Sequence, residues 1–149
     1  MILKILVATD GSKIALKAAK YAVDLAKQLN ASIIILSVID NRSLISQIAP
    51  VTTTTVHMIE PIEDYLKEAA EGYVREIKKL CDKVGVQSKT LITTGYPVEK
   101  IVSEARKLKA NLIVMGSRGK SVLEAAVLGS VTYGVIHKNI KLPILVIKE

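Results

Sequence analysis

Residues 2–39 read ILKILVATDGSKIALKAAKYAVDLAKQLNASIIILSVI, and this stretch decides the predicted fold. Two short runs of aliphatic and β-branched residues, 2–8 and 32–39, flank a longer segment, residues 12–29. In the longer segment the apolar side chains recur along one helical stripe, and the lysines lie mostly off it. A strand, an amphipathic helix and a second strand, in that order, predict parallel strands joined by a helical crossover.

The same alternation continues along the rest of the chain. The unbroken apolar run within residues 32–39 is typical of a strand that is covered on both faces. Pro61 and Pro97 can each occupy the first position of a helix, and Gly85 can end the helix that Pro61 begins. We therefore expect an α/β fold with five strands and four helices in a single domain, residues 1–149. The further strands are expected at residues 87–93, 112–115 and 143–148, and the further helices at residues 61–84, 97–108 and 131–138.

Residues 41–60 interrupt this pattern, because they show neither helical nor strand periodicity. A stretch of this length without secondary structure is uncommon inside a compact domain unless it is functional or mobile. We expect it to form a flap, and we assign no role to its threonine run, residues 52–55.

Length and composition narrow the class of protein. A chain of 149 residues is enough for one core and too short for two domains of ordinary size. Half of the residues are hydrophobic but only 3% are aromatic, which predicts an aliphatic core. Cys81 is the only cysteine, so no intrachain disulfide can form, and no Cys/His cluster has the spacing of a structural zinc site.

The beginning of the chain does not read as a signal peptide, because Lys4 interrupts the apolar run and Asp10 follows it. No apolar run approaches the roughly 20 residues that a membrane helix needs. We therefore expect a cytoplasmic protein that does not enter the membrane. The net charge of +7 would attract polyanions. Because the lysines are spread over every expected helix and few aromatics could stack on bases, nucleic-acid binding is not expected.

The strongest motif begins where the fourth strand ends: Gly116, two residues, Gly119, nine residues, and then Gly129-Ser130. The first two glycines would let backbone amides approach an anion without a Cβ atom and would allow positive φ. Gly129 and Ser130 would open a helix whose free amides attract the same anion, with the Ser130 hydroxyl as a further donor. The pattern indicates a phosphate cradle, although an ordinary turn followed by an N-capped helix would use the same residues.

Asp10 follows the first strand and has two interpretations. Its carboxylate could cap the next helix, or it could accept a ribose hydroxyl and hold a metal ion.

Other nucleotide motifs are excluded by their spacing. Val114 stands where a P-loop requires its first glycine, and no G-x-G-x-x-G follows the first strand. Thr93 and Thr94 stand where a response-regulator receiver requires an aspartate.

The motifs together resemble the universal stress proteins, and specifically the branch of that family that binds ATP. The resemblance spans the whole chain and is carried by ILVATDGS at residues 5–12, LSVID at residues 36–40, the glycine motif through residue 132, and PILVI at residues 143–147. It implies a doubly wound parallel sheet of strand order 3-2-1-4-5 with helices on both faces, an adenine nucleotide alpha-hydrolase-like architecture. ATP would lie across the carboxyl ends of strands one and four.

Within this resemblance each motif residue has an implied role. The backbone of Val38 would contact adenine, with Ala8 and Thr9 beside it. Asp10 would lie near the ribose and near a Mg²⁺ or Mn²⁺ ion that bridges the triphosphate and the protein. The long side chain of Arg118 could contact the nucleotide or point to water. The phosphates would be bound by Gly116, Gly119, Gly129 and Ser130, and the same motif would be lined by Met115, Arg118, Val131 and Thr132.

The resemblance also implies a nucleotide-dependent switch in signalling or stress tolerance, in which bound ATP presents a surface to an unidentified protein partner. Two alternatives remain open: a slow ATP hydrolase that requires a partner, and an interaction module that binds no nucleotide. We expect weak hydrolysis at most, since neither His57 nor His137 has a neighbour in sequence that would define a general base.

Residues 143–148 would form a strand at one edge of the sheet, with apolar side chains on both faces. An uncovered edge of this kind favours pairing with another strand. As in relatives, we expect a homodimer in which these strands run antiparallel across a two-fold axis.

Overall fold

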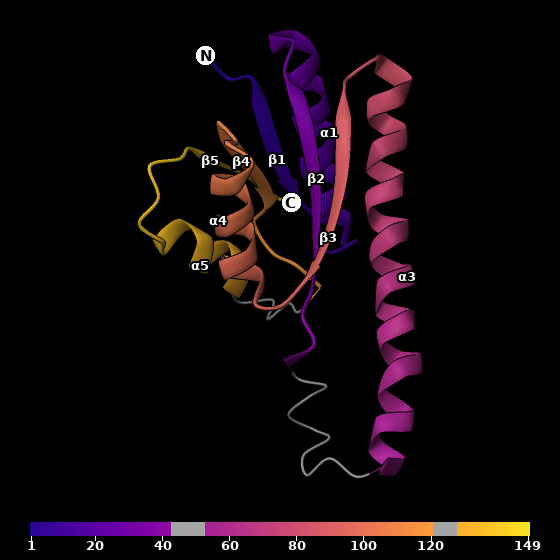
Figure 1. Cartoon of the computed structure of the whole chain (residues 1–149). Helices are drawn as coiled ribbons and strands as arrows, with labels where there is room; N and C mark the ends of the chain where they lie inside the picture. The colour runs from indigo at the N-terminus through magenta and orange to yellow at the C-terminus, as the bar shows by residue number, and fades with distance from the viewer. Residues whose placement is uncertain (43–52, 121–127) are drawn as a thin grey trace.

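The computed structural model describes residues 1–42, 53–120 and 128–149, and for residues 53–60 it describes the backbone alone. No helix within these ranges is long and apolar enough to cross a membrane. Strands and helices alternate along the chain (Figure 1). In chain order they are β1 (Lys4–Ala8), α1 (Lys13–Leu29), β2 (Ser32–Ile39), α3 (Thr53–Val84), β3 (Ser88–Thr94), α4 (Pro97–Lys107), β4 (Leu112–Gly116), α5 (Ser130–His137) and β5 (Ile144–Ile147).

The strands form one five-stranded parallel sheet in the order β3-β2-β1-β4-β5. β1 lies at its centre, where Val7 is level with Ile35 of β2 and with Val114 of β4. The predicted fold class and strand order are therefore confirmed. The order of the strands reverses between β1 and β4, and open α/β sheets commonly bind ligands at such a point.

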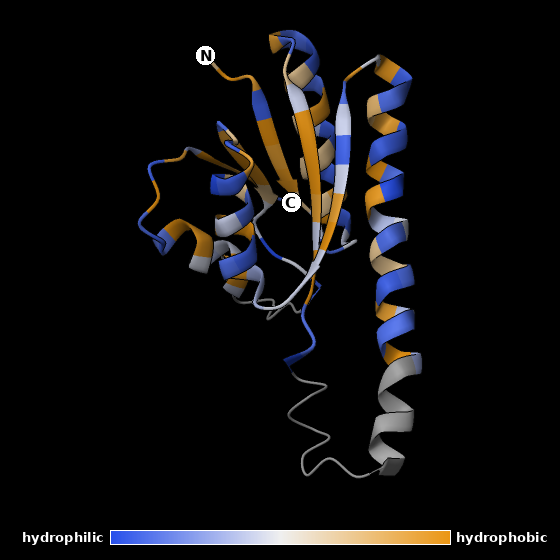
Figure 2. Ribbon diagram, viewed as in Figure 1, coloured by the Kyte–Doolittle hydropathy of each residue, from blue (hydrophilic) through white to orange (hydrophobic). Residues whose placement is uncertain are grey.

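Helices cover both faces of the sheet. Alternate side chains of a strand point to opposite faces, so the apolar strands place hydrophobic residues on both. Ile5 and Val7 pack on one side with α1 and α3, whereas Leu6 packs on the other side with α4 and α5. All three side chains are fully buried. Figure 2 shows the hydrophobic residues concentrated along the central strands. Burial of this aliphatic surface, at about 25 cal/mol per Å², is the main stabilising contribution to the fold.

Local capping residues define the ends of the helices, among them Gly85, as the sequence predicts. The Ser12 hydroxyl accepts a hydrogen bond from the Ala15 amide at 3.1 Å, a capping contact worth about 1 kcal/mol. Asn30 follows α1 in the left-handed region at φ 53°, and Gly85 follows α3 there at φ 76°. These residues fix where the chain turns into β2 and β3.

The prediction for residues 41–60 is wrong in part. α3 begins at Thr53, so residues 53–60 are helical and Pro61 lies inside the helix rather than at its start. A proline within a helix removes one hydrogen bond and crowds the preceding turn, but a 32-residue helix keeps its bonds on either side. The remainder of the predicted flap includes residues 43–52, which lie outside the described residues.

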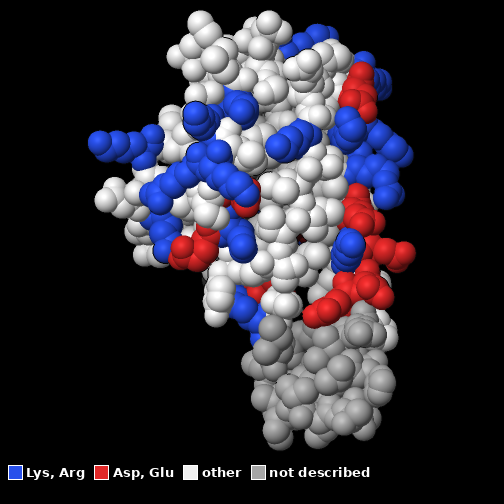
Figure 3. Space-filling view, viewed as in Figure 1, with Lys and Arg blue, Asp and Glu red and all other residues white. Residues whose placement is uncertain are grey.

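Charge is distributed unevenly over the face shown in Figure 3. Lys and Arg side chains gather on the side of α4 and α5, and both basic and acidic side chains lie along α3. The excess of basic residues is therefore interrupted by acidic groups on this face.

Candidate functional site

A hollow of about 540 Å³ opens at the carboxyl ends of β1, β2 and β4, where the strand order reverses. All of the site residues that the sequence predicts line this hollow, although they come from four separate parts of the chain. They are Ala8, Thr9, Asp10, Val38, Met115, Gly116, Arg118, Gly119, Gly129, Ser130, Val131 and Thr132.

Three hydrogen bonds hold the glycine motif beside the sheet. The Ser117 amide donates to the Ile147 carbonyl at 2.8 Å, and the Gly129 amide donates to the Ser117 carbonyl at 2.7 Å. The buried hydroxyl of Thr132 donates to the Gly116 carbonyl at 2.8 Å. The start of α5 is thereby fixed against the end of β4.

The first turn of α5 supplies backbone amides at the rim of the hollow. Amides in the first turn of a helix have no acceptor within that helix, which leaves those of Ser130, Val131 and Thr132 able to bind an anion. Gly129 precedes them as the N-cap residue, and no side chain caps the helix. A helix N-terminus carries about half a positive charge, so this end of the hollow suits a phosphate group.

Close packing requires glycine at two positions of the motif. A Cβ atom on Gly129 would lie 3.1 Å from the Cα atom of Arg118 and 3.4 Å from the amide nitrogen of Gly119. A Cβ atom on Gly119 would clash with the Oδ2 atom of Asp10. The two loops therefore approach each other only because these residues lack side chains.

Gly116 also has a packing role that the sequence did not predict. A Cβ atom there would clash with the side chain of Ile14 and would lie 3.3 Å from the Ala15 amide nitrogen, so this glycine lets α1 pack closely on β4. Gly116 and Gly119 do not use the positive φ that glycine allows, and at both positions a Cβ atom would instead meet neighbouring side chains. Among the described glycines, positive φ occurs at Gly11, Gly85 and Gly95.

Asp10 joins the turn after β1 to the loop after β4. Its Oδ1 atom accepts a hydrogen bond from the Ser12 amide at 3.0 Å, and its Oδ2 atom accepts one from the Lys120 amide at 2.8 Å. Ser12 rather than Asp10 caps α1, so the interpretation of Asp10 as a helix cap is wrong. The carboxylate is exposed, and each of its oxygens keeps a further lone pair for a hydroxyl or a metal ion.

Metal ligands are sparse around Asp10. Within residues 1–42, 61–120 and 128–149, no three His, Cys, Asp or Glu side chains cluster to hold an ion. Mg²⁺ in proteins is often held by one or two carboxylates together with substrate phosphates. The carboxylate of Asp10 therefore fits a metal ion that arrives with a nucleotide, and does not by itself make a protein metal site.

The other half of the hollow is apolar. Ala8, Val38 and Met115 line it at the ends of three strands, as the sequence predicts. Leu36 and Ile101 also line it and are buried. Sequence reasoning missed these two, because a buried aliphatic residue at a site has the same pattern as one in the core. Such walls suit a flat, largely apolar ring.

Two arginines line the hollow, and each is held by a carboxylate. Arg118 pairs with Glu149 and its side chain is only 16% exposed, so it does not point to water. Arg42 donates to both carboxylate oxygens of Asp40, at 2.8 and 2.6 Å. These bonds hold the pKa of the Asp40 carboxyl below its usual value.

Lys120 also lines the hollow, but its partner is an aromatic ring. Its Nζ atom lies 4.3 Å from the centroid of the Tyr73 ring on α3 and donates to the Tyr73 hydroxyl. The ring packs against Gly11, where a Cβ atom would clash with it and where φ is 79°. Sequence reasoning missed this contact, because Tyr73 lies on a helical stripe that reads as core or interface.

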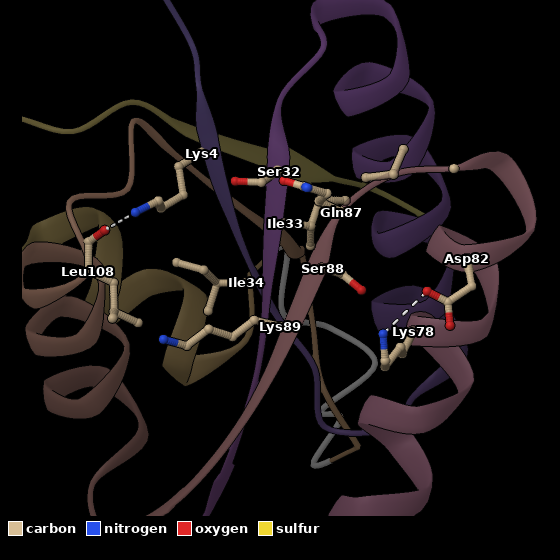
Figure 4. Close-up of a pocket in the computed structure, with 12 residues that line it drawn as sticks. Lys4, Ser32, Ile33, Ile34, Lys78, Asp82, Gln87, Ser88, Lys89 and Leu108 are labelled. Carbon is tan, nitrogen blue, oxygen red and sulfur yellow. Dashed lines mark hydrogen bonds and ion pairs between the residues drawn. The ribbon is translucent and has the colours of Figure 1, made fainter.

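A second hollow, of about 600 Å³, lies at the opposite ends of the strands (Figure 4). Here the Lys4 ammonium donates to the Leu108 carbonyl at 2.9 Å, and Lys78 pairs with Asp82 at 3.2 Å. The C-terminal end of α3 is close by, and its partial negative charge disfavours anions. Although this hollow is slightly larger, no helix N-terminus of the described chain and none of the predicted site residues line it.

Cys81 and His137, two reactive side chains that the structure describes, do not line the first hollow. Cys81 is fully buried in the core, and burial raises the pKa of its thiol. The His137 ring stacks on Tyr133, and its Nδ1 atom lies 2.8 Å from the Tyr133 carbonyl oxygen. The side chain of His57 lies outside the described residues.

Comparison with known proteins gives one consistent result. The sequence matches the universal stress protein family over residues 1–148. The universal stress protein MJ0531 of Methanocaldococcus jannaschii is 38% identical over 146 residues, which cover 98% of this chain and 82% of that protein. The solved structure of protein MJ0577 from the same organism has a TM-score of 0.85 and 35% identity, covering 100% of this chain and 97% of that one. A universal stress protein solved in complex with cAMP has a TM-score of 0.68 and 25% identity, covering 99% and 97%.

Proposed function

The chain belongs to the universal stress protein family, and from this premise we propose that it binds ATP and acts as a nucleotide-dependent switch in signalling or stress tolerance. The observation that carries the proposal is the composition of one hollow, which joins an apolar half to a helix N-terminus with uncapped amides. An adenine nucleotide needs both surfaces side by side. The relative that was solved with cAMP supports an adenine nucleotide as the ligand.

Each part of the nucleotide has a counterpart in the hollow. Adenine would lie against Ala8, Thr9 and Val38, between the apolar walls. The exposed carboxylate of Asp10 would contact the ribose, and would also contact a Mg²⁺ or Mn²⁺ ion bound to the phosphates. The phosphates would be held by the amides at the start of α5, beside the closely packed Gly119 and Gly129.

A switch accounts for the site better than an efficient hydrolase does. Hydrolysis needs a general base within hydrogen-bond reach of the attacking water. No histidine among the described side chains lines the hollow. Of its carboxylates, Asp10 accepts two backbone amides and Asp40 is paired with Arg42. We therefore propose at most slow hydrolysis, and a partner could still supply the missing group.

The test begins with protein to which no nucleotide has been added during purification. Freshly purified protein is denatured, and the supernatant is analysed for adenine nucleotides by chromatography. Titration calorimetry of the stripped protein with ATP then gives the affinity. Absence of released nucleotide together with absence of binding heat would overturn the proposal in favour of an interaction module that binds no nucleotide. Phosphate release from bound ATP would instead support the slow hydrolase.

Assembly and location remain predictions. β5 lies at an edge of the sheet with Leu145 exposed, which supports the homodimer expected through residues 143–148. The identity of a protein partner is open, and the cytoplasmic location stays a prediction.

A further inference from the structure

Three of the described cationic side chains line the hollow, and their contact partners differ in charge. Arg118 and Arg42 are paired with the carboxylates of Glu149 and Asp40. Lys120 is held by the neutral ring and hydroxyl of Tyr73. An arginine that moves to a phosphate exchanges its carboxylate partner for another anion. A lysine that moves from a phenol to a phosphate exchanges a neutral partner for an anion and so gains an ionic hydrogen bond. Of these three cations, Lys120 therefore gains most from a phosphate.

The backbone of Lys120 is fixed at the phosphate end of the hollow. It directly follows Gly119, and its amide donates to the Oδ2 atom of Asp10 at 2.8 Å. Its side chain is exposed, so the ammonium can move without breaking any packing in the core. A fixed backbone with a long, freely rotating side chain can reach an extended ligand at low cost.

Tyr73 gives the ammonium a defined position when no phosphate is present. Its ring is seated against Gly11, and no other residue type leaves room for the ring there. The turn at Gly11, the ring on α3 and the loop at Lys120 thus meet on one side of the hollow. A cation placed over an aromatic face at an exposed site is held by about 0.5–1 kcal/mol, little enough to be displaced by a phosphate.

We propose that Lys120 is a specificity residue, whose ammonium leaves Tyr73 to bind the terminal phosphates and so makes the hollow prefer nucleoside triphosphates to nucleoside monophosphates. This inference rests on the proposed function, because it assumes that an adenine nucleotide occupies the hollow. A monophosphate would be held by the start of α5 alone and would leave the Lys120 ammonium on the ring. The selectivity therefore comes from Lys120, the residue that directly follows the second glycine of the motif.

The experiment measures affinities for ATP and AMP by calorimetry, in EDTA, for the whole protein and three variants. Lys120→Met keeps most of the side-chain length and removes the charge. It should weaken ATP binding about tenfold to hundredfold and change AMP binding by about twofold or less. Tyr73→Phe removes the hydroxyl acceptor and should leave ATP binding as tight or tighter. Lys89→Ala, at the opposite end of the sheet (Figure 4), removes the same charge far from the site and controls for net charge.

The outcomes separate this inference from the function on which it rests. The proposed selectivity would be overturned if Lys120→Met lost ATP affinity and AMP affinity to the same extent. It would also be overturned if Lys120→Met bound ATP as tightly as Lys89→Ala does. In both cases binding by the parent protein would leave the proposed function standing. A parent protein that binds neither nucleotide would overturn both. Because Lys120 is exposed, an unchanged thermal midpoint should accompany each result.

Discussion

The Oδ2 atom of Asp10 accepts a hydrogen bond from the backbone amide of Lys120 at 2.8 Å. The two residues are 110 positions apart in the sequence, and the contact is possible because Gly119 presents no side chain to the carboxylate. The other carboxylate oxygen is bound by the Ser12 amide at the start of α1. A single side chain therefore connects the two loops that border the hollow, so a ligand that contacts Asp10 acts on both.

Replacement of Asp10 by asparagine should weaken ATP binding by about tenfold in Mg²⁺, and less in EDTA. Asparagine lacks the negative charge, and its NH2 group would take the place of one of the two oxygens that accept from the Ser12 and Lys120 amides. Calorimetric titrations in the two buffers measure the difference. An equal loss in both would mean that Asp10 contacts the ribose rather than a metal ion.

Gly129→Ala should abolish or strongly weaken ATP binding while the fold is retained. The added methyl would lie 3.1 Å from the Cα atom of Arg118, so the amides behind it must shift away from their positions. Gly72→Ala, inside α3, is the matched control because a Cβ atom there meets nothing within 4 Å. The control should raise stability by about 0.5–1 kcal/mol and leave binding unchanged. Equal ATP affinity in both variants would count against the amide cradle.

Gly116→Ala should destabilise the protein by about 1–3 kcal/mol, because the new methyl clashes with the Ile14 side chain. Ile14→Ala removes the obstructing atoms and is itself destabilising, by about 2–5 kcal/mol. The stability lost in the double variant should be smaller, by at least about 1 kcal/mol, than the sum of the losses in the two single variants. Urea denaturation of the four proteins measures this coupling. Strict additivity would show that Gly116 is needed for another reason.

Val146→Pro should convert a dimer into a monomer without disturbing the sheet. The carbonyls of Pro143 and Ile147 accept hydrogen bonds from β4, so in this parallel pairing the amides of Ile144 and Val146 point away from β4. Proline is tolerated on an edge strand where its missing amide faces outward. Sedimentation velocity at micromolar concentration, with Val146→Ala as the control, measures the result. A parent protein that sediments as a monomer would remove the basis for the expected homodimer.

Acid should weaken the contact between Asp40 and Arg42. The hydrogen bonds from Arg42 lower the pKa of the Asp40 carboxyl in the folded protein relative to the unfolded chain. The contact therefore adds stability above the pKa of the unfolded chain, and this stability is lost as pH falls through the lower pKa of the folded protein. Asp40→Asn should lower the thermal midpoint more at pH 7 than at about pH 3. The same loss at both values would show that the charge of Asp40 does not matter.

Local signals in the sequence predict most of the fold. Asn30 and Gly85 act through backbone conformation and Ser12 through a hydrogen bond to an amide three residues on, so these roles depend only on local sequence. The predicted site residues all line one hollow, because each motif follows a strand and parallel strands end at the same edge.

Contacts between side chains that are far apart in the sequence could not be predicted from local signals. Nothing in the sequence pairs Arg118 with Glu149, because the reach of a long side chain depends on the packing of β4 beside β5. The same holds for Tyr73 and Lys120, which meet only because α3 passes the turn at Gly11. The early start of α3 was missed because a proline inside a helix has the same sequence pattern as a proline that begins one.

Ser117 joins the start of α5 to the edge of the sheet, since its amide donates to the Ile147 carbonyl of β5 and its carbonyl accepts from the Gly129 amide. If β5 pairs with a second copy of the chain, self-association and ligand uptake both act on Ser117, and we expect them to be thermodynamically linked. The dissociation constant for ATP should then vary with the amount of protein in the titration cell, and Val146→Pro should remove that variation.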